Sequence, residues 1–114
     1  SPATDYIEED VDLNIHLIKN VPATFIIRVQ GKSMTDVGIY DGDLLVVDKS
    51  LKPKNFSTVV ANVHDELVVK NFVKEKDEQF LTSGSKKIED KITINNDSEI
   101  FIWGVVTYVI HSVY

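Results

Sequence analysis

The sequence has no cysteine among its 114 residues. This absence excludes a disulfide framework, a thiol nucleophile and a cysteine-ligated zinc site. It fits a protein of a reducing cytoplasm, where disulfides are rare. The chain starts with polar and acidic residues, so no signal peptide is visible, and its uncharged last segment is too short and interrupted for a membrane helix. We therefore expect a cytoplasmic protein with no membrane partner.

Positive charge is scarce as well. The chain has 12 Lys and Arg residues against 18 Asp and Glu residues, which gives a formal net charge of -6. An acidic domain is a poor general DNA binder, because neutralising phosphates requires a basic surface. We expect no direct nucleic-acid binding, and any action on DNA would pass through protein partners.

Histidine occurs only three times, at His16, His64 and His111. A Ser-His-Asp triad is the chemical competitor for any serine nucleophile, but no histidine here lies in a motif that supports one. His64 falls in a predicted turn and should be solvated, and the other two lie on apolar segments. Scattered histidines without acids at ligand spacing also make a poor metal site, so we expect no metal and no other cofactor.

What the chain does contain is a succession of short apolar runs. Its composition, 43% hydrophobic and 26% charged, is ordinary for one small globular domain. Strands are expected at residues 24–30, 43–48, 58–63, 66–73, 79–82, 92–94 and within 100–114. A tight turn at His64 and Asp65 should join its two flanking strands into a hairpin. Many strands and few helical residues predict an all-β or mainly β domain.

The two ends of the chain differ in character. Residues 1–12 carry acidic but no basic side chains and are interpreted as a flexible, extended N-terminal arm. Residues 12–19 follow as one or two helical turns with Asp12 as the N-cap. Residues 83–87 are expected to form a loop. Residues 100–114 contain no charged side chain, which suggests a strand buried on both faces, in the core or partly against a second copy of the chain.

The stretch from Arg28 to Asp48 organises the rest of the chain. An apolar run stops at Gly31, Ser33 follows in a polar segment, and a second apolar run begins after Gly38 and the turn at Asp41-Gly42-Asp43. A glycine between strands allows a left-handed turn, which lifts the next residues off the sheet edge and frees their amides. A serine on such a ledge acts as a nucleophile only when a base lies within hydrogen-bond reach.

Lys70 is the best candidate for that base. It lies in the predicted strand 66–73, where a period of two places it on one face with Val68 and Phe72. Desolvation between apolar neighbours disfavours the ammonium and can lower a lysine pKa by roughly 3 to 5 units from about 10.4. Taken alone, Ser33 is a turn residue and Lys70 an edge-strand lysine; only the pair favours catalysis.

Several segments carry a resemblance to a known family. They are Gly31-Lys32-Ser33-Met34, Gly38-Ile39, Asp41-Gly42-Asp43-Leu44-Leu45-Val46-Val47-Asp48 and Val68-Val69-Lys70. In this order they resemble the LexA/UmuD family of self-cleaving serine proteases, most closely its UmuD branch. Residues 1–6 look like the segment just downstream of that branch's cleavage site, and Trp103-Gly104-Val105-Val106 looks like the closing strand. Residues 1–12 are then the arm of a processed form, and residues 13–114 the peptidase domain.

The resemblance implies a compact, strongly bent sheet with Ser33 as nucleophile and Lys70 as general base in a surface cleft. Backbone amides at Ser33 and an adjacent residue would stabilise the oxyanion. Met34 and Lys32 would contribute to the wall of the cleft through side chain or backbone, and Gly31 and Gly38 would shape the ledge. The turn at residues 41–43 is given no catalytic role.

By the same resemblance, the cleaved form would be a homodimer that serves an error-prone, Y-family (UmuC-like) translesion polymerase in the SOS response, with the RecA filament as a further partner. Its source would be bacterial, or a phage or plasmid. The alternative is the C-terminal dimerisation and self-cleavage domain of a LexA-like or phage repressor, and the length of the full gene product would distinguish the two. The chain departs from the family pattern at Phe56-Ser57-Thr58 and at Thr82-Ser83-Gly84-Ser85.

Overall fold

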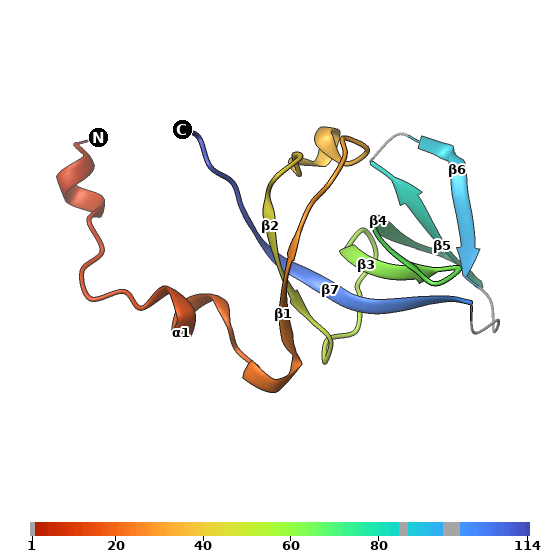
Figure 1. The fold of residues 1–114 in the computed structure, drawn as a ribbon, viewed down its shortest axis with the longest axis horizontal. Helices are drawn as coiled ribbons and strands as arrows, with labels where there is room; N and C mark the ends of the chain where they lie inside the picture. Colours follow the sequence, from red (N-terminus) through yellow and green to blue (C-terminus); the bar gives the residue numbers. More distant parts are fainter. Residues whose placement is uncertain (1, 85–86, 95–98) are drawn as a thin grey trace.

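The computed structural model describes residues 2–84, 87–94 and 99–114, and it has the predicted mainly β fold. Seven strands form one antiparallel sheet in the order β1-β2-β7-β3-β4-β5-β6 (Figure 1). The strands are β1 (Thr24–Arg28), β2 (Leu44–Asp48), β3 (Thr58–Val63), β4 (Glu66–Glu75), β5 (Glu78–Ser83), β6 (Lys87–Ile94) and β7 (Ile100–Ile110). The helical elements are short: η1 (Ala3–Tyr6), α1 (Leu13–Leu17), η2 (Val21–Ala23) and η3 (Thr35–Val37).

The hairpin between β3 and β4 has the turn that the sequence predicts. His64 and Asp65 both have positive φ, 49° and 69°, as a two-residue type I′ turn requires. The turn sets the register of the hairpin, in which Val63 faces Glu66. The register in turn fixes where each side chain of β4 lies, including that of Lys70.

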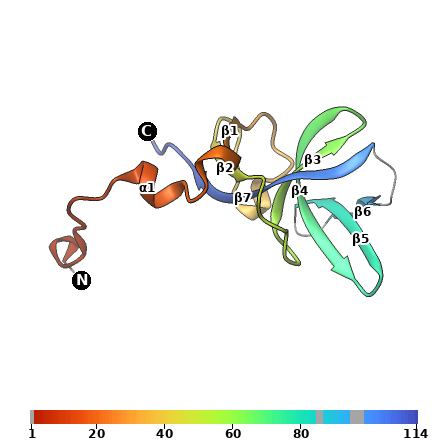
Figure 2. The ribbon, with the colours of Figure 1, turned by 90° about the horizontal axis from the view of Figure 1, so that it is seen from below.

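Strand β7 joins the two parts of the sheet. Its first half pairs with β3 and its second half with β2, and the register shifts once in each half, at Trp103 and at Thr107. Each shift inserts one extra residue into β7, and such bulges bend a strand and increase its twist. Figure 1 and Figure 2 show the result: β1 and β2 lie on one side of β7, and β3 to β6 lie on the other. The sheet is therefore bent, and its two parts can enclose a cleft.

The core lies on both faces of the bent sheet. Along β3, Val60 packs into one buried cluster, whereas Val59 and Ala61 pack into the other. This alternation is the period-two pattern of a strand covered on both faces. The first cluster also contains Met34 and Ile39 from the segment between β1 and β2, so that segment is part of the core.

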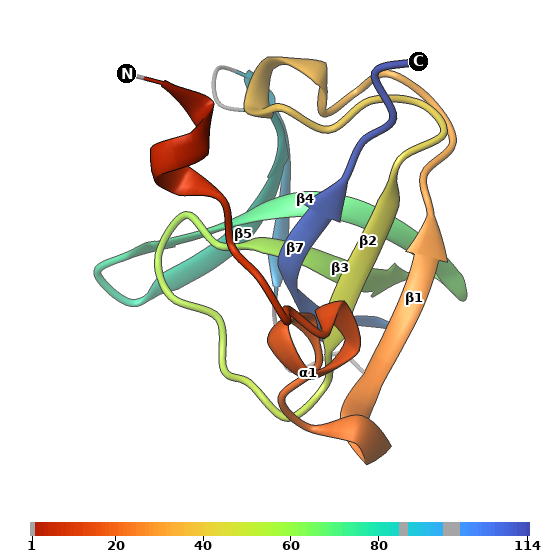
Figure 3. The same cartoon turned by 90° about the vertical axis from the view of Figure 1, so that its left-hand side faces the viewer.

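The N-terminal region lies apart from the sheet. Residues 2–16 are exposed, and the segment before α1 extends away from the strands (Figure 2). Asp12 is the N-cap of α1, as predicted, because its carboxylate accepts hydrogen bonds from the amides of Asn14 and Ile15. Helix α1 lies beside β2 and β7 (Figure 3), where the rings of His16 and Tyr108 are 6.1 Å apart. No helix in the described ranges is long and apolar enough to span a bilayer.

One prediction about local structure is wrong, and another holds only in part. The loop expected at residues 83–87 is shorter, because Ser83 still belongs to β5 and pairs with Lys87 at the start of β6; residues 85 and 86 lie outside the described residues. The last segment is buried only in part: Gly104 and Val105 are buried, but Tyr108, Val109 and Ile110 are 37%, 38% and 43% exposed, because the described chain covers the end of β7 incompletely. Packing of this end against a second copy stays a prediction.

Gly104 gives a test of the packing of β7. A Cβ built on Gly104 would lie 2.6 Å from Val47 Cγ1, and Val47 is fully buried. Gly104→Ala should therefore destabilise the fold by about 1–3 kcal/mol through overpacking, measured by urea unfolding. The clash should be partly relieved in the double variant Gly104→Ala/Val47→Ala, which should be more stable than the sum of the two single changes predicts. Strict additivity would contradict the assigned contact.

Candidate active site

The segment between β1 and β2 is closed by main-chain hydrogen bonds at its base. The Val29 amide donates to the Asp43 carbonyl (N···O 2.8 Å), and the Gly42 amide donates to the Val29 carbonyl (2.9 Å). A further bond runs from the Gly31 amide to the Asp41 carboxylate (2.8 Å). Gly31 has φ +101° and Gly38 φ +86°, which are left-handed conformations that favour glycine. We call residues 30–38 the ledge.

Met34 anchors the ledge to the core. Its side chain is 3% exposed, and its carbonyl accepts hydrogen bonds from the amides of Val37 and Ile39. Ser33, directly before it, is exposed. The exposed Ser33 hydroxyl is therefore next to the buried Met34 thioether, and burial of the thioether holds the hydroxyl at the surface.

Ser33 and Lys70 line the same cleft, which has a volume of about 330 Å³. One wall comes from the end of β1 and from the ledge, including Gly31 and Met34, and the other comes from residues 67–70 at the start of β4. Two residues that are far apart in the sequence are thus brought to one cavity by the bend of the sheet.

Lys70 is half-buried and has a partner that the sequence analysis missed. Its Nζ donates a hydrogen bond to Ser83 Oγ on β5 (2.5 Å). The predicted neighbours Val68 and Phe72 pack in or against the second buried cluster. An ammonium has three donors, so the bond to Ser83 leaves donor capacity for a group in the cleft.

Two amides of the ledge, those of Ser33 and Met34, have no hydrogen-bond acceptor in the described residues. In the described parts of the chain, neither the Ser33 amide nor the Met34 amide donates a hydrogen bond, although both are adjacent to the candidate nucleophile. Lys32 is exposed and is absent from the described lining of the cleft; its carbonyl accepts bonds from the amide and hydroxyl of Thr35. A role for Lys32 in the cleft wall stays a prediction.

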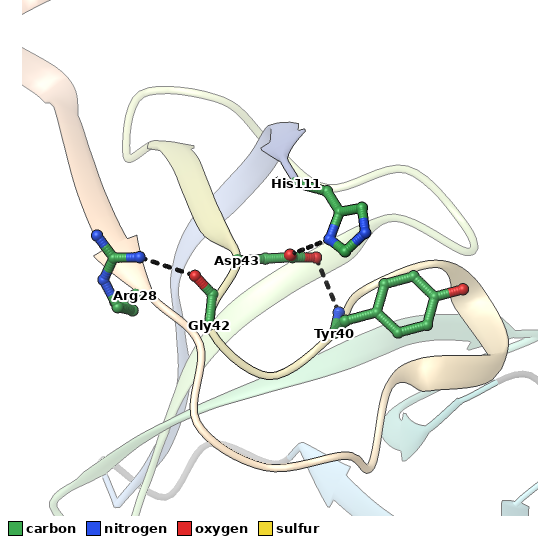
Figure 4. A network of polar contacts seen from close by, with 5 residues as sticks. All are labelled: Arg28, Tyr40, Gly42, Asp43 and His111. Carbon is green, nitrogen blue, oxygen red and sulfur yellow. Dashed lines mark hydrogen bonds and ion pairs between the residues drawn. The ribbon is translucent and has the colours of Figure 1, made fainter. Parts of the chain in front are cut away.

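A histidine–carboxylate pair lies nearby, and sequence reasoning missed it. His111 Nδ1 lies 2.6 Å from Asp43 Oδ1, and the Tyr40 amide donates to the other carboxylate oxygen at 2.8 Å (Figure 4). The bond from Tyr40 lowers the pKa of Asp43 below its ordinary value of 3.8; the adjacent His111 acts in the same direction, and burial opposes both. Arg28 donates to the Gly42 carbonyl on the same turn. The pair therefore ties the end of β7 to the base of the ledge.

This pair does not form a triad with Ser33 in the cleft, since the described lining includes neither Asp43 nor His111. The contact of His64 with Glu99 (3.1 Å) is largely exposed, as expected for a solvated turn histidine. Within residues 2–84, 87–94 and 99–114, no group of three or more histidine, cysteine or acidic side chains is arranged to hold a metal ion. Among the described residues, the groups at the cleft that could take part in a reaction are therefore a hydroxyl, an amine and backbone amides.

The fold defines the class of the protein as a bent antiparallel β-sheet domain with a cleft that a serine and a lysine both line. The model of the family described as Peptidase S24-like matches residues 1–107. The chain belongs to this family, which comprises serine peptidases of the self-cleaving kind.

Individual relatives agree with this assignment. The chain is 40% identical to protein ImpA of Escherichia coli over 111 residues, which are 97% of this chain and 74% of ImpA. It is 37% identical to protein MucA of Escherichia coli over 108 residues, 95% of this chain and 73% of MucA. Both relatives are homologues of UmuD. The LexA repressor of Clostridium acetobutylicum is 35% identical over 75 residues, 66% of this chain and 37% of the repressor.

The position of Asp43 predicts a pH-dependent contribution to stability. Because its folded-state pKa is lowered, the ionised carboxylate stabilises the fold above its ordinary value of 3.8, and this contribution is lost as the pH falls through the folded-state pKa. Asp43→Asn should therefore lower the thermal midpoint at neutral pH, and its difference from the parent should shrink in acid. Asp77→Asn, on the exposed turn between β4 and β5, is the matched control. A pH-independent difference would contradict the assignment.

Proposed function

We propose that this chain is a self-cleaving peptidase domain in which Ser33 is the nucleophile and Lys70 the general base. The observation that carries the proposal is the placement of both residues on one cleft. Neither residue would be distinctive by itself, since serine is common in turns and lysine is common on strands. Both residues line one cavity next to amides without described partners, and a nucleophile and its base must share such a site.

The reaction is acyl transfer from a peptide bond. Neutral Lys70 Nζ takes the proton of Ser33 Oγ, and Oγ forms a bond to the peptide carbonyl carbon. The amides of Ser33 and Met34 stabilise the resulting oxyanion. The C–N bond then breaks as the leaving amine takes the proton from Lys70. Water attacks the acyl-enzyme by the same route and gives its proton first to Lys70 and then to Ser33 Oγ, which restores the free enzyme.

The substrate in this proposal is an extended segment upstream of the domain, from the same chain or from a second copy. Strand β1 is terminal in the sheet order, so one of its edges is open to a further strand, and residues 27–30 at its end line the cleft. An extended peptide can add to such an edge through main-chain hydrogen bonds. This placement would carry a scissile carbonyl past Ser33.

In the proposed second stage, the cleaved form is a dimeric accessory subunit of a Y-family, UmuC-like translesion polymerase in the bacterial SOS response. The RecA filament would be the trigger and partner, in the cytoplasm, without direct DNA binding by this acidic chain. The matches to ImpA and MucA support this role, because they cover 97% and 95% of this chain and about three quarters of each relative. The repressor alternative rests on a match that covers 37% of a LexA repressor.

The dyad can be tested in a chain extended upstream of Ser1 by a cleavage segment of this family. Ser33→Ala and Lys70→Ala should each slow self-cleavage by at least about 100-fold, the smaller end of what general acid–base catalysis contributes, without changing the thermal midpoint. Cleavage is followed on denaturing gels. Lys74→Ala, an exposed lysine on the same strand, should leave the rate unchanged. A Lys70→Ala chain that still cleaves at the parental rate would remove the dyad.

The proposed homodimer can be tested at the exposed end of β7. Tyr108 and Ile110 present apolar surface there, and an uncovered apolar patch is typical of an interaction site. Ile110→Lys should shift the chain from dimer to monomer in sedimentation velocity at micromolar concentration. Phe56→Lys, which changes an apolar residue that is 71% exposed in a loop before β3, should leave the dimer intact. Sedimentation of the parent chain only as monomer would exclude the homodimer.

A further inference from the structure

Ser83 is a buried hydroxyl that the proposed mechanism has not used. It ends β5, it is 6% exposed, and its Oγ accepts the hydrogen bond from Lys70 Nζ. A surface serine would exchange such a bond for water, but a buried one cannot. The bond therefore fixes the position of the lysine amine at the wall of the cleft.

The register of the sheet places the two residues opposite each other. On the β4–β5 hairpin, Asn71 faces Thr82, and one further step along an antiparallel ladder places Lys70 opposite Ser83. Side chains of directly opposed residues lie on the same face of a sheet and within contact distance. The main chain thus presents the Ser83 hydroxyl to Lys70.

The end of β5 is also attached to the ledge. The Gly84 amide donates a hydrogen bond to Met34 Sδ (3.2 Å), and the Thr82 hydroxyl donates to the Gly84 carbonyl (3.2 Å). Ser83 lies between these two residues. The segment that holds the lysine amine is therefore bonded to the residue next to the candidate nucleophile, so the two halves of the site share one support.

We infer that Ser83 is a positioning residue that aims the Lys70 amine at Ser33. This inference rests on the proposed function of the Ser33 and Lys70 pair. A neutral amine has two N–H groups and one lone pair. When one N–H is held by Ser83, rotation about the Cε–Nζ bond is restricted, and the lone pair can be kept toward the cleft. Ser83 contacts the Lys70 amine and not the nucleophile or the peptide bond, and it acts only through Lys70.

The test compares self-cleavage of the extended chain in three variants. Ser83→Ala removes only the hydroxyl and should slow cleavage by about 10- to 100-fold, the scale of effect when a reacting group loses its orienting partner. Ser83→Thr keeps a hydroxyl and should restore most of the rate. Thr58→Val removes a half-buried hydroxyl that bonds Asn71 rather than Lys70, and should remain within about threefold of the parent on the same scale.

A spectroscopic measurement makes the test independent of cleavage. In the chain labelled with 15N-lysine, the Nζ protons of Lys70 should exchange with water faster in Ser83→Ala than in the parent or in Thr58→Val. Should Ser83→Ala fail to fold, Ser83→Cys, which keeps the size but offers a weaker acceptor, takes its place with the same expected direction.

The failure of this inference is distinguishable from that of the proposed function. If Ser33→Ala and Lys70→Ala stop cleavage but a folded Ser83→Ala cleaves at the parental rate, the positioning role is overturned while the dyad stands. If Lys70→Ala cleaves normally, the dyad itself is wrong, and the positioning role fails with it. A loss of rate in Thr58→Val equal to that in Ser83→Ala would also overturn the inference, because it would indicate a general packing effect.

Discussion

Burial of the Met34 side chain is the interaction on which the geometry of the site depends. The ledge is a polar segment with two left-handed glycines, and it would have no fixed position without an apolar anchor. Met34 supplies that anchor by packing with Val60 and the first buried cluster, and its sulfur accepts the hydrogen bond from Gly84. An unbranched thioether suits this role, because it adapts to an irregular gap while remaining apolar. The ledge, the core and the end of β5 thus meet at one side chain.

Much of the fold could be predicted from sequence, because strands and turns are local patterns. The β3–β4 hairpin follows from two alternating runs around His64 and Asp65, and the Asp12 cap follows from a single side chain that reaches amides of its own turn. How much of the end of β7 is covered could not be predicted, for a physical reason. An uncharged, β-branched segment is equally suited to a core and to an interface, and composition does not separate the two.

Contacts between segments that are far apart in the chain could not be predicted from the sequence. The contact of His111 with Asp43 joins the end of β7 to a turn between β1 and β2, and no spacing rule relates such positions. The contact of Ser83 with Lys70 could more nearly have been predicted from the sequence than the contact of His111 with Asp43. Had the turn at residues 76–77 been identified as a two-residue hairpin, the register alone would have placed Ser83 opposite Lys70. The sequence pattern instead predicts a loop at Ser83, at a place where the chain departs from the family pattern.

The bend of the sheet determines which side chains lie inside the cleft, and these side chains determine the chemistry of the site. A histidine base requires an acid to orient it, and the chain does contain an oriented pair in Asp43 and His111. That pair, however, lies at the base of the ledge, where it supports the turn through the Tyr40 amide. The cleft instead receives Lys70, whose hydrogen-bond partner is the neutral Ser83 hydroxyl rather than a carboxylate. A carboxylate at that place would stabilise the ammonium and oppose its use as a base, whereas a hydroxyl can hold the amine in position with far less stabilisation of its charge.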